Sequence, residues 1–227
     1  MTRESGGRAS LFLTICPFFT VFPALLLMLG ALSDTVQRWC LGDADTAAGI
    51  LRACRTWCVL MVGAAVLGVV LTLAVTLLAA DALRKRGAAG MWTNLLKMAA
   101  IPLAVEVLLC GALLRSEVLP LLQRVGPDLR QIESGQLESR EVWFLPGQAS
   151  THLPGAFGPE KDLVQYQVRD MDGEILIVYL PACWNFAPEG TYQASKDLDW
   201  NRENTLRYRL EVTSQFRLST LVPEQLP

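Results

Sequence analysis

Residues 57–80 read WCVLMVGAAVLGVVLTLAVTLLAA, a run of 24 residues without a charged side chain. A helix needs about 20 mainly apolar residues to cross the hydrocarbon core of a bilayer. The run therefore predicts a membrane-spanning helix. Ala64 and Gly68 lie four residues apart, beside Gly63, and small residues at this spacing let a second helix approach closely. We expect this face to pack against another helix of the same chain rather than against a second copy.

Two further apolar stretches flank this run and predict two more spans. Residues 10–32 contain no charged side chain, and Arg3 and Arg8 precede them. A cleaved signal peptide is the alternative interpretation, but its apolar region is usually only about 7–15 residues long. Residues 98–114 predict the third span, which ends there or continues to Leu122. We therefore expect a transmembrane helical region over residues 1–122.

The composition changes after this region, which indicates two parts. Hydrophobic residues make up 52% of the chain and charged residues 19%. Residues 1–122 carry 10 Lys/Arg and 7 Asp/Glu, a net charge of +3, whereas residues 123–227 carry 10 and 15, a net charge of −5. Nucleic-acid binding requires a basic surface, so the acidic second part argues against a nucleic-acid partner.

The second part predicts a small β-rich domain. Residues 123–134 form a helical tail or linker, and residues 135–227 form the soluble domain. Asp172-Gly173 is typical of a hairpin turn, and the Gly- and Pro-rich segment 146–161 predicts a loop. Apolar and polar residues alternate in most of the predicted strands, which are 141–145, 163–168, 174–180, 205–212 and 216–222. The expected fold class is a membrane protein of the α+β type, with three transmembrane helices followed by a barrel- or sandwich-like domain.

The distribution of basic residues predicts the orientation. Lys and Arg in short loops near the ends of spans tend to stay in the cytoplasm. The second loop carries Arg84, Lys85 and Arg86, and the N-terminal tail carries two arginines on the same side. A counterweight lies in the first loop, at Arg38, Arg52 and Arg55. The tighter cluster favours an integral cytoplasmic membrane protein with its N-terminus inside and its C-terminal domain outside.

The six cysteines form no C-x-x-C pair, and with a single histidine the chain has no zinc pattern. In the predicted orientation Cys40 and Cys54 lie in an external loop, where a disulfide between them could persist. A nucleophilic pair of Cys183 and His152 would need the two side chains within hydrogen-bond reach. Nothing in the sequence brings them together, and we expect Cys183 to be a buried structural residue.

Glu106 is the single acidic residue within the three apolar stretches. Carboxyl groups at membrane depth are costly and usually face the interior of a helix bundle or a polar cavity. One interpretation is a proton or ion site, or a charge that pairs with a partner subunit. The other is a neutral acid that hydrogen-bonds to a threonine of a neighbouring helix, with four candidates: Thr14, Thr20, Thr72 and Thr76.

Two groups of residues in the second part are further candidates. Asp197, Asp199 and Asn201 resemble the start of a calcium loop, but such a loop needs Gly at position 6 and Glu at position 12. Arg202 and Tyr208 occupy those positions, which favours a solvated acidic loop. Four aromatic residues either line a binding groove or fold back to cap the domain: Trp184, Phe186, Tyr192 and Trp200.

Two functions compete on this basis. The first is a membrane-anchored binding or assembly module that displays the β domain outside the cytoplasmic membrane to a protein partner. The second is an accessory subunit of a membrane transport or export complex, in which Glu106 in the helix bundle is the functional residue. An enzyme is not expected, because nucleophile-elbow, zinc-protease and phosphate-loop motifs are absent from the sequence. We expect no cofactor.

Overall fold

The computed structural model describes residues 24, 27–31, 33, 35–36, 40, 44–85, 89–151, 163–190 and 205–227. Contacts divide the chain into two compact units. The helix unit comprises Met1–Ser33 and Val59–Ser116, and the sheet unit comprises Asp34–Cys58 and Glu117–Pro227. The segment 123–134, a linker or tail by sequence, thus belongs to the same unit as the sheet.

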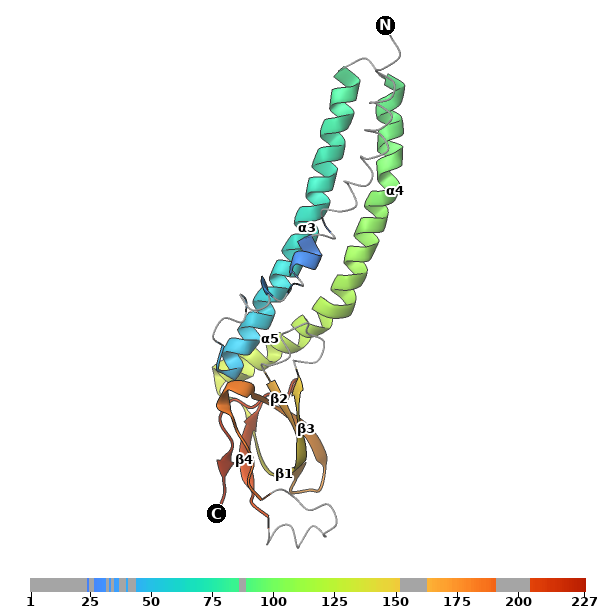
Figure 1. Cartoon of the computed structure of the whole chain (residues 1–227). Coiled ribbons are helices and arrows are strands. Elements are labelled where there is room, and N and C mark those ends of the chain that lie inside the picture. Colours follow the sequence, from blue (N-terminus) through green and yellow to red (C-terminus); the bar gives the residue numbers. More distant parts are fainter. Residues whose placement is uncertain are drawn as a thin grey trace. The chain divides into compact units, whose positions relative to one another are not determined.

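The helix unit is built on two long helices. α3 spans Ala47–Lys85 and α4 spans Ala89–Leu113, and their parts in this unit run along each other in opposite directions (Figure 1). Among the residues that the structure describes, two helical stretches are long and apolar enough to cross a membrane, Ala47–Lys85 and Asn94–Ser134. The prediction of three is therefore not met there. Most of the first predicted span, 10–32, lies outside the described residues.

The second segment of the sheet unit begins at Glu117, within a π-helical turn that follows α4. A π-helical turn, Leu114–Val118, follows α4, and α5 spans Leu119–Ser134. α5 ends at Gly135, whose left-handed backbone (φ +68°) lets its N–H donate to the Ile132 carbonyl. Glycine adopts this conformation at helix C-termini without steric cost, so the sequence Ser134-Gly135 fixes the end of the helix.

The sheet has five antiparallel strands in the order β3-β2-β1-β4-β5. Alternate residues from β1 to β4 fill one buried face, and Val142, Phe144 and Tyr166 lie in it. The predicted turn at Asp172-Gly173 is confirmed between β2 and β3, where Asp170 Oδ1 accepts the N–H groups of Asp172 and Glu174. The strands are β1 (Glu138–Thr151), β2 (Leu163–Asp170), β3 (Ile175–Pro181), β4 (Tyr208–Val212) and β5 (Glu224–Gln225).

Two strand predictions were wrong. β1 continues to Thr151 through the start of the predicted loop 146–161, because a register shift between Phe144 and Gln148 absorbs Pro146 and Gly147. Gly147 has φ +103°, which permits this irregularity. The predicted strand 216–222 is replaced by a turn and two isolated bridges, and the last strand is β5.

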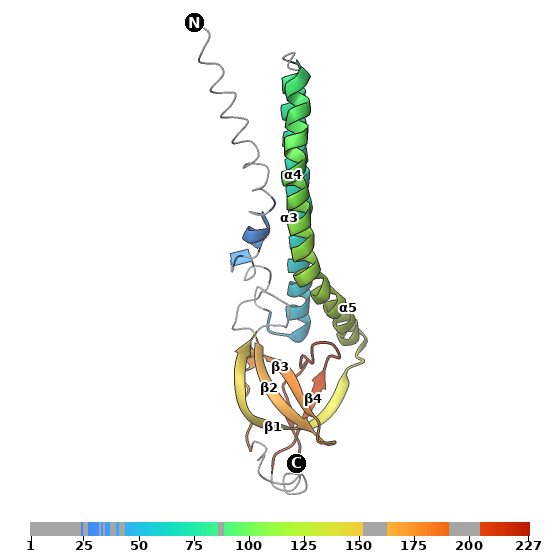
Figure 2. The same ribbon diagram turned by 90° about the vertical axis from the view of Figure 1, so that its right-hand side faces the viewer.

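The sheet is open, so a closed barrel is not formed. β1 is strongly curved (Figure 2), and the curvature brings β3 and β4 toward a common short segment. Ser219 N–H donates to the Tyr179 carbonyl of β3 (2.8 Å), and Ser219 also bridges Val212 of β4. Isolated bridges replace a ladder here because the chain turns away immediately before this point.

Asp128 of α5 fixes the turn at residues 214–216 through hydrogen bonds. It is fully buried, and its two carboxylate oxygens accept the N–H groups of Gln215 and Phe216, each at 2.9 Å. One helical turn later, Gln131 Oε1 accepts the Ser214 N–H at 2.9 Å. Three consecutive turn amides therefore find their acceptors on one face of α5, which otherwise buries apolar residues: Leu121, Val125 and Leu129.

Replacing Asp128 should destabilise the sheet unit. Asp128→Ala leaves two amide groups without acceptors, and we expect the free energy of unfolding to fall by about 2–5 kcal/mol. Denaturant unfolding of the full chain in mild detergent measures it. Glu133→Ala is the matched control on the exposed side of α5, where the ion pair with Arg52 contributes about 0–1 kcal/mol. Equal stability of the two variants would contradict this role of Asp128.

Candidate functional site

Glu106 lies inside the helix unit. α4 places it on the same stripe as Leu95 and Cys110, and all three side chains are buried. The carboxyl group is fully buried, and its Oε1 accepts the backbone N–H of Ala24 at 3.2 Å. The acid predicted to face the interior of the bundle therefore does so within the described residues.

Ala24 also packs against α3. A Cβ atom added to Gly68 would lie 2.3 Å from the Cα of Ala24, far inside contact distance. Only glycine fits at this position, as expected for a small residue that faces another helix of the same chain. Ala24 thus touches α3 through Gly68 and α4 through Glu106.

The second oxygen of Glu106 differs from the first. Oε2 is buried and has no hydrogen-bond partner among the described residues. Of the four threonines considered as partners, Thr76 donates its hydroxyl to the Thr72 carbonyl, and Thr14 and Thr20 lie outside the described residues. A buried acceptor without a partner costs about 1–3 kcal/mol, so among the described residues of the unit this oxygen is well placed to receive a hydrogen bond.

An aromatic cluster organises the sheet unit. The ring of Phe186 lies 5.2 Å from Phe144, 5.7 Å from Tyr208 and 6.0 Å from Tyr166, in tilted or edge-to-face geometry. Phe186 therefore packs against the core, as in the second of the two roles considered for the aromatic residues, and it also lines a groove. Trp184 packs on the same core and donates its Nε1–H to the Asp45 carbonyl at 3.1 Å. Tyr192 and Trp200 lie outside the described residues.

Tyr166 joins this cluster to β1. Its hydroxyl contacts the Phe186 carbonyl and lies 2.9 Å from Gln148 Oε1. A phenol has one proton, so donation to the carbonyl requires the Gln148 amide to present its NH₂ group to the phenol oxygen. A phenol is protonated at neutral pH, and burial raises the pKa of Tyr166 further.

A half-open groove of about 240 Å³ lies beside this bond. Most of the residues that line it are apolar, but polar atoms form the larger part of its exposed lining, and the side chains of Gln148 and Asn185 carry amide groups there. Asn185 has a left-handed backbone (φ +48°), which asparagine tolerates better than most residues. The groove can hold an apolar side chain and hydrogen-bond to its main chain. It is lined by Gln148, Val164, Tyr166, Leu180, Pro181, Ala182, Asn185, Phe186 and Ala187.

Of the remaining candidates, the structure describes Cys40, Cys54 and Cys183. Cys183 is exposed rather than buried, and its Sγ lies 3.5 Å from the Asp45 carbonyl oxygen. His152 lies outside the described residues, as do the three candidate calcium ligands, Asp197, Asp199 and Asn201. Among the described residues, no group of three or more His, Cys, Asp or Glu could hold a metal ion. Cys40 and Cys54 are not bonded to each other, and their disulfide stays a prediction.

Sequence reasoning missed the residues that shape the groove and its support. Gln148 was assigned to a loop, and Asn185 carries no motif. Asp128 did leave a signal, because it falls on the apolar face of α5 in phase with Leu121 and Val125. A polar residue at a buried helical position is a candidate for a long-range hydrogen bond.

Comparisons with protein-family models, curated proteins and solved structures found no match to this chain. Its function is therefore inferred from geometry.

The aromatic cluster generates a stability prediction. Phe186→Ala removes a ring that contacts three others, and we expect the free energy of unfolding to fall by about 2–4 kcal/mol. Leu221→Ala is the control, because that side chain is exposed. Denaturant unfolding followed by tryptophan fluorescence compares them. An Phe186→Ala protein as stable as the control would mean that Phe186 does not cap the core.

Proposed function

We propose that the chain is a membrane-anchored binding module. Apolar helices hold it in the cytoplasmic membrane, and the sheet unit binds a protein partner outside. The anchoring is supported by the large apolar side chains that α3 and α4 turn outward, such as Leu78 (71% exposed) and Leu108 (72% exposed). Soluble monomers rarely expose large contiguous apolar patches, whereas lipid tails accommodate such a surface without cost.

The groove of the sheet unit carries the proposal of binding. Leu180 and Pro181 give it an apolar wall, and the amides of Gln148 and Asn185 can both donate and accept hydrogen bonds. This combination suits an extended polypeptide that inserts one apolar side chain and pairs its adjacent peptide groups with the amides. At about 240 Å³ the groove is smaller than the 300–1,000 Å³ typical of small-molecule sites, which favours a side chain as the occupant.

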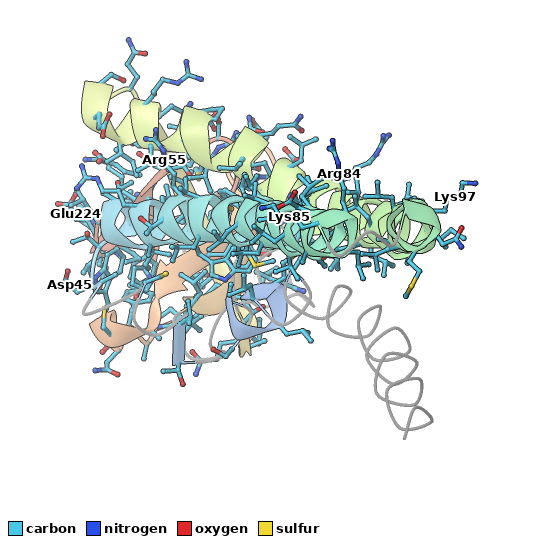
Figure 3. All side chains as sticks on the ribbon, turned by 90° about the horizontal axis from the view of Figure 1, so that it is seen from above. Asp45, Arg55, Arg84, Lys85, Lys97 and Glu224 are labelled. Carbon is cyan, nitrogen blue, oxygen red and sulfur yellow. The ribbon has the colours of Figure 1, made fainter. Side chains whose placement is uncertain are left out.

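The proposed topology has three spans, with the N-terminus inside and the sheet unit outside. Arg84 and Lys85 are exposed in the last turn of α3, and Lys97 is exposed on α4 (Figure 3). These residues support a cytoplasmic location for the connection between α3 and α4. Arg52 and Arg55, also exposed on α3, are the counterweight, and Arg52 is paired with Glu133 at 3.5 Å.

Thiol labelling tests this topology. In a cysteine-free chain, a thiol at Ser139 should react with a membrane-impermeant maleimide on intact cells, and a thiol at Gly90 should react only after lysis. Both positions are exposed, and α4 separates them. The reverse pattern would place the sheet unit in the cytoplasm. Labelling of both thiols on intact cells would contradict a membrane crossing by α4.

Site-specific photo-cross-linking tests binding. A photoreactive residue at Ala187, on the rim of the groove, should give a discrete adduct in intact cells, and the same residue at Gln225 should not. Ala182→Trp fills the groove and should abolish the adduct while leaving the melting temperature of the chain unchanged. Equal adducts from both positions, or an adduct that survives Ala182→Trp, would contradict binding in the groove.

A second candidate function is an accessory subunit of a transport or export complex. Oε2 of Glu106, which has no hydrogen-bond partner among the described residues, favours it, because a buried acid in an apolar unit often marks a proton or ion pathway. Purification in mild detergent separates the candidates. Membrane subunits that co-purify independently of the groove would support this second function.

A further inference from the structure

Two buried contacts meet at Ala24, one with Gly68 of α3 and one with Glu106 of α4, and they suggest a role for Glu106 that does not depend on ion chemistry. We infer that Glu106 is the docking residue that holds the first apolar segment against α3 and α4, so that this segment is a permanent part of the helix unit and not a removable leader. The structure describes Ala24 and Leu27–Ala31 of the segment, and these residues are helical.

The hydrogen bond between Ala24 and Glu106 determines where the segment docks. Ala24 N–H is buried and follows Pro23, and Glu106 Oε1 accepts it at 3.2 Å. Leaving a backbone N–H unpaired in an apolar environment costs about 1–3 kcal/mol, and Glu106 Oε1 is the acceptor that the described residues supply, so this bond favours one depth for the segment. An apolar residue in place of Glu106 supplies no acceptor for this N–H.

Packing on the same side of the segment supports docking. Ala24 and Met28 are fully buried and Ala31 nearly so, whereas Leu27 and Leu29 are exposed. Spacings of four and three residues place the buried side chains on one helical face. This face meets α3 at Gly68, and α3 buries residues at matching spacings around it, Met61, Ala65 and Thr72.

Removal of the segment would leave a defect in the unit. Glu106 would lose its one hydrogen-bond partner among the described residues, and the backbone of Gly68 would lose the Ala24 contact that excludes any side chain there. A cleaved leader makes no contacts in the mature protein. This segment, by contrast, donates a hydrogen bond to the buried Glu106 and packs beside Gly68. We therefore expect the mature protein to retain the first apolar segment.

A nicked-chain experiment tests the inference. A protease site is inserted between residues 42 and 43 of the full chain, which carries different tags at its two ends. After cleavage in mild detergent, the N-terminal fragment should co-elute with the C-terminally tagged remainder. Glu106→Leu should reduce its recovery at least tenfold. Glu106→Gln should retain it, because the amide carbonyl still accepts the N–H, although this variant abolishes acid chemistry.

Matched variants serve as controls. Val107→Leu alters an exposed neighbour of Glu106, and Gly63→Leu alters an exposed glycine with open space around it, so both should retain the fragment. Gly68→Leu should release it. If the uncut Glu106→Leu chain is not monodisperse, the glycine pair decides: release by Gly68→Leu alone supports docking, and equal behaviour of the two overturns it. Release of the wild-type fragment, or its full retention by a monodisperse Glu106→Leu chain, also overturns the inference.

Discussion

The bond between one buried carboxylate and two backbone amides sets the form of the sheet unit. Asp128 accepts the N–H groups of Gln215 and Phe216, which no strand partner could satisfy at a turn. Because the turn is fixed, Leu218 and Ser219 enter the space between β3 and β4 and make their isolated bridges there. The curled sheet is thereby held around its core, although its hydrogen-bond ladder does not close.

The same constraint explains why α5 belongs with the sheet. A helix with one apolar face could pack in several registers, but a carboxylate that must reach two amides has one. Gln131 reinforces the register through Ser214. At the groove, a side chain also fixes a distant segment. The hydrogen bond from the Tyr166 hydroxyl to the Phe186 carbonyl positions the segment that forms one wall.

Local patterns in the sequence predict the helices and turns that neighbouring residues determine. The uncharged run 57–80 lies within α3, and the Asp172-Gly173 turn joins β2 to β3. Alternation alone misassigns 216–222, because the hydrogen bonds that turn this segment come from a helix more than eighty residues earlier. Gln148 was missed because Pro146 and Gly147 look like a loop but are absorbed into a strand by a shift in register.

The candidate sites follow the same division. The apolar context of Glu106 was evident from the sequence, but its acceptor role toward Ala24 joins residues 82 positions apart. Phe186 was recognisable as an aromatic residue, whereas its contacts with three rings depend on the finished sheet. Local sequence can thus nominate a residue, and only the long-range contacts decide whether it supports the core, lines a groove or docks a segment.

Amide hydrogen exchange at Gln215 and Phe216 tests the central role of Asp128 most directly. Turn amides exposed to water exchange rapidly, whereas amides held by a buried carboxylate open only with the unit around them. In the wild-type chain both amides should exchange as slowly as those of β1 and β2, and Asp128→Ala should accelerate them far more than the amides of β2. Rapid exchange of both amides in the wild-type chain would contradict the account.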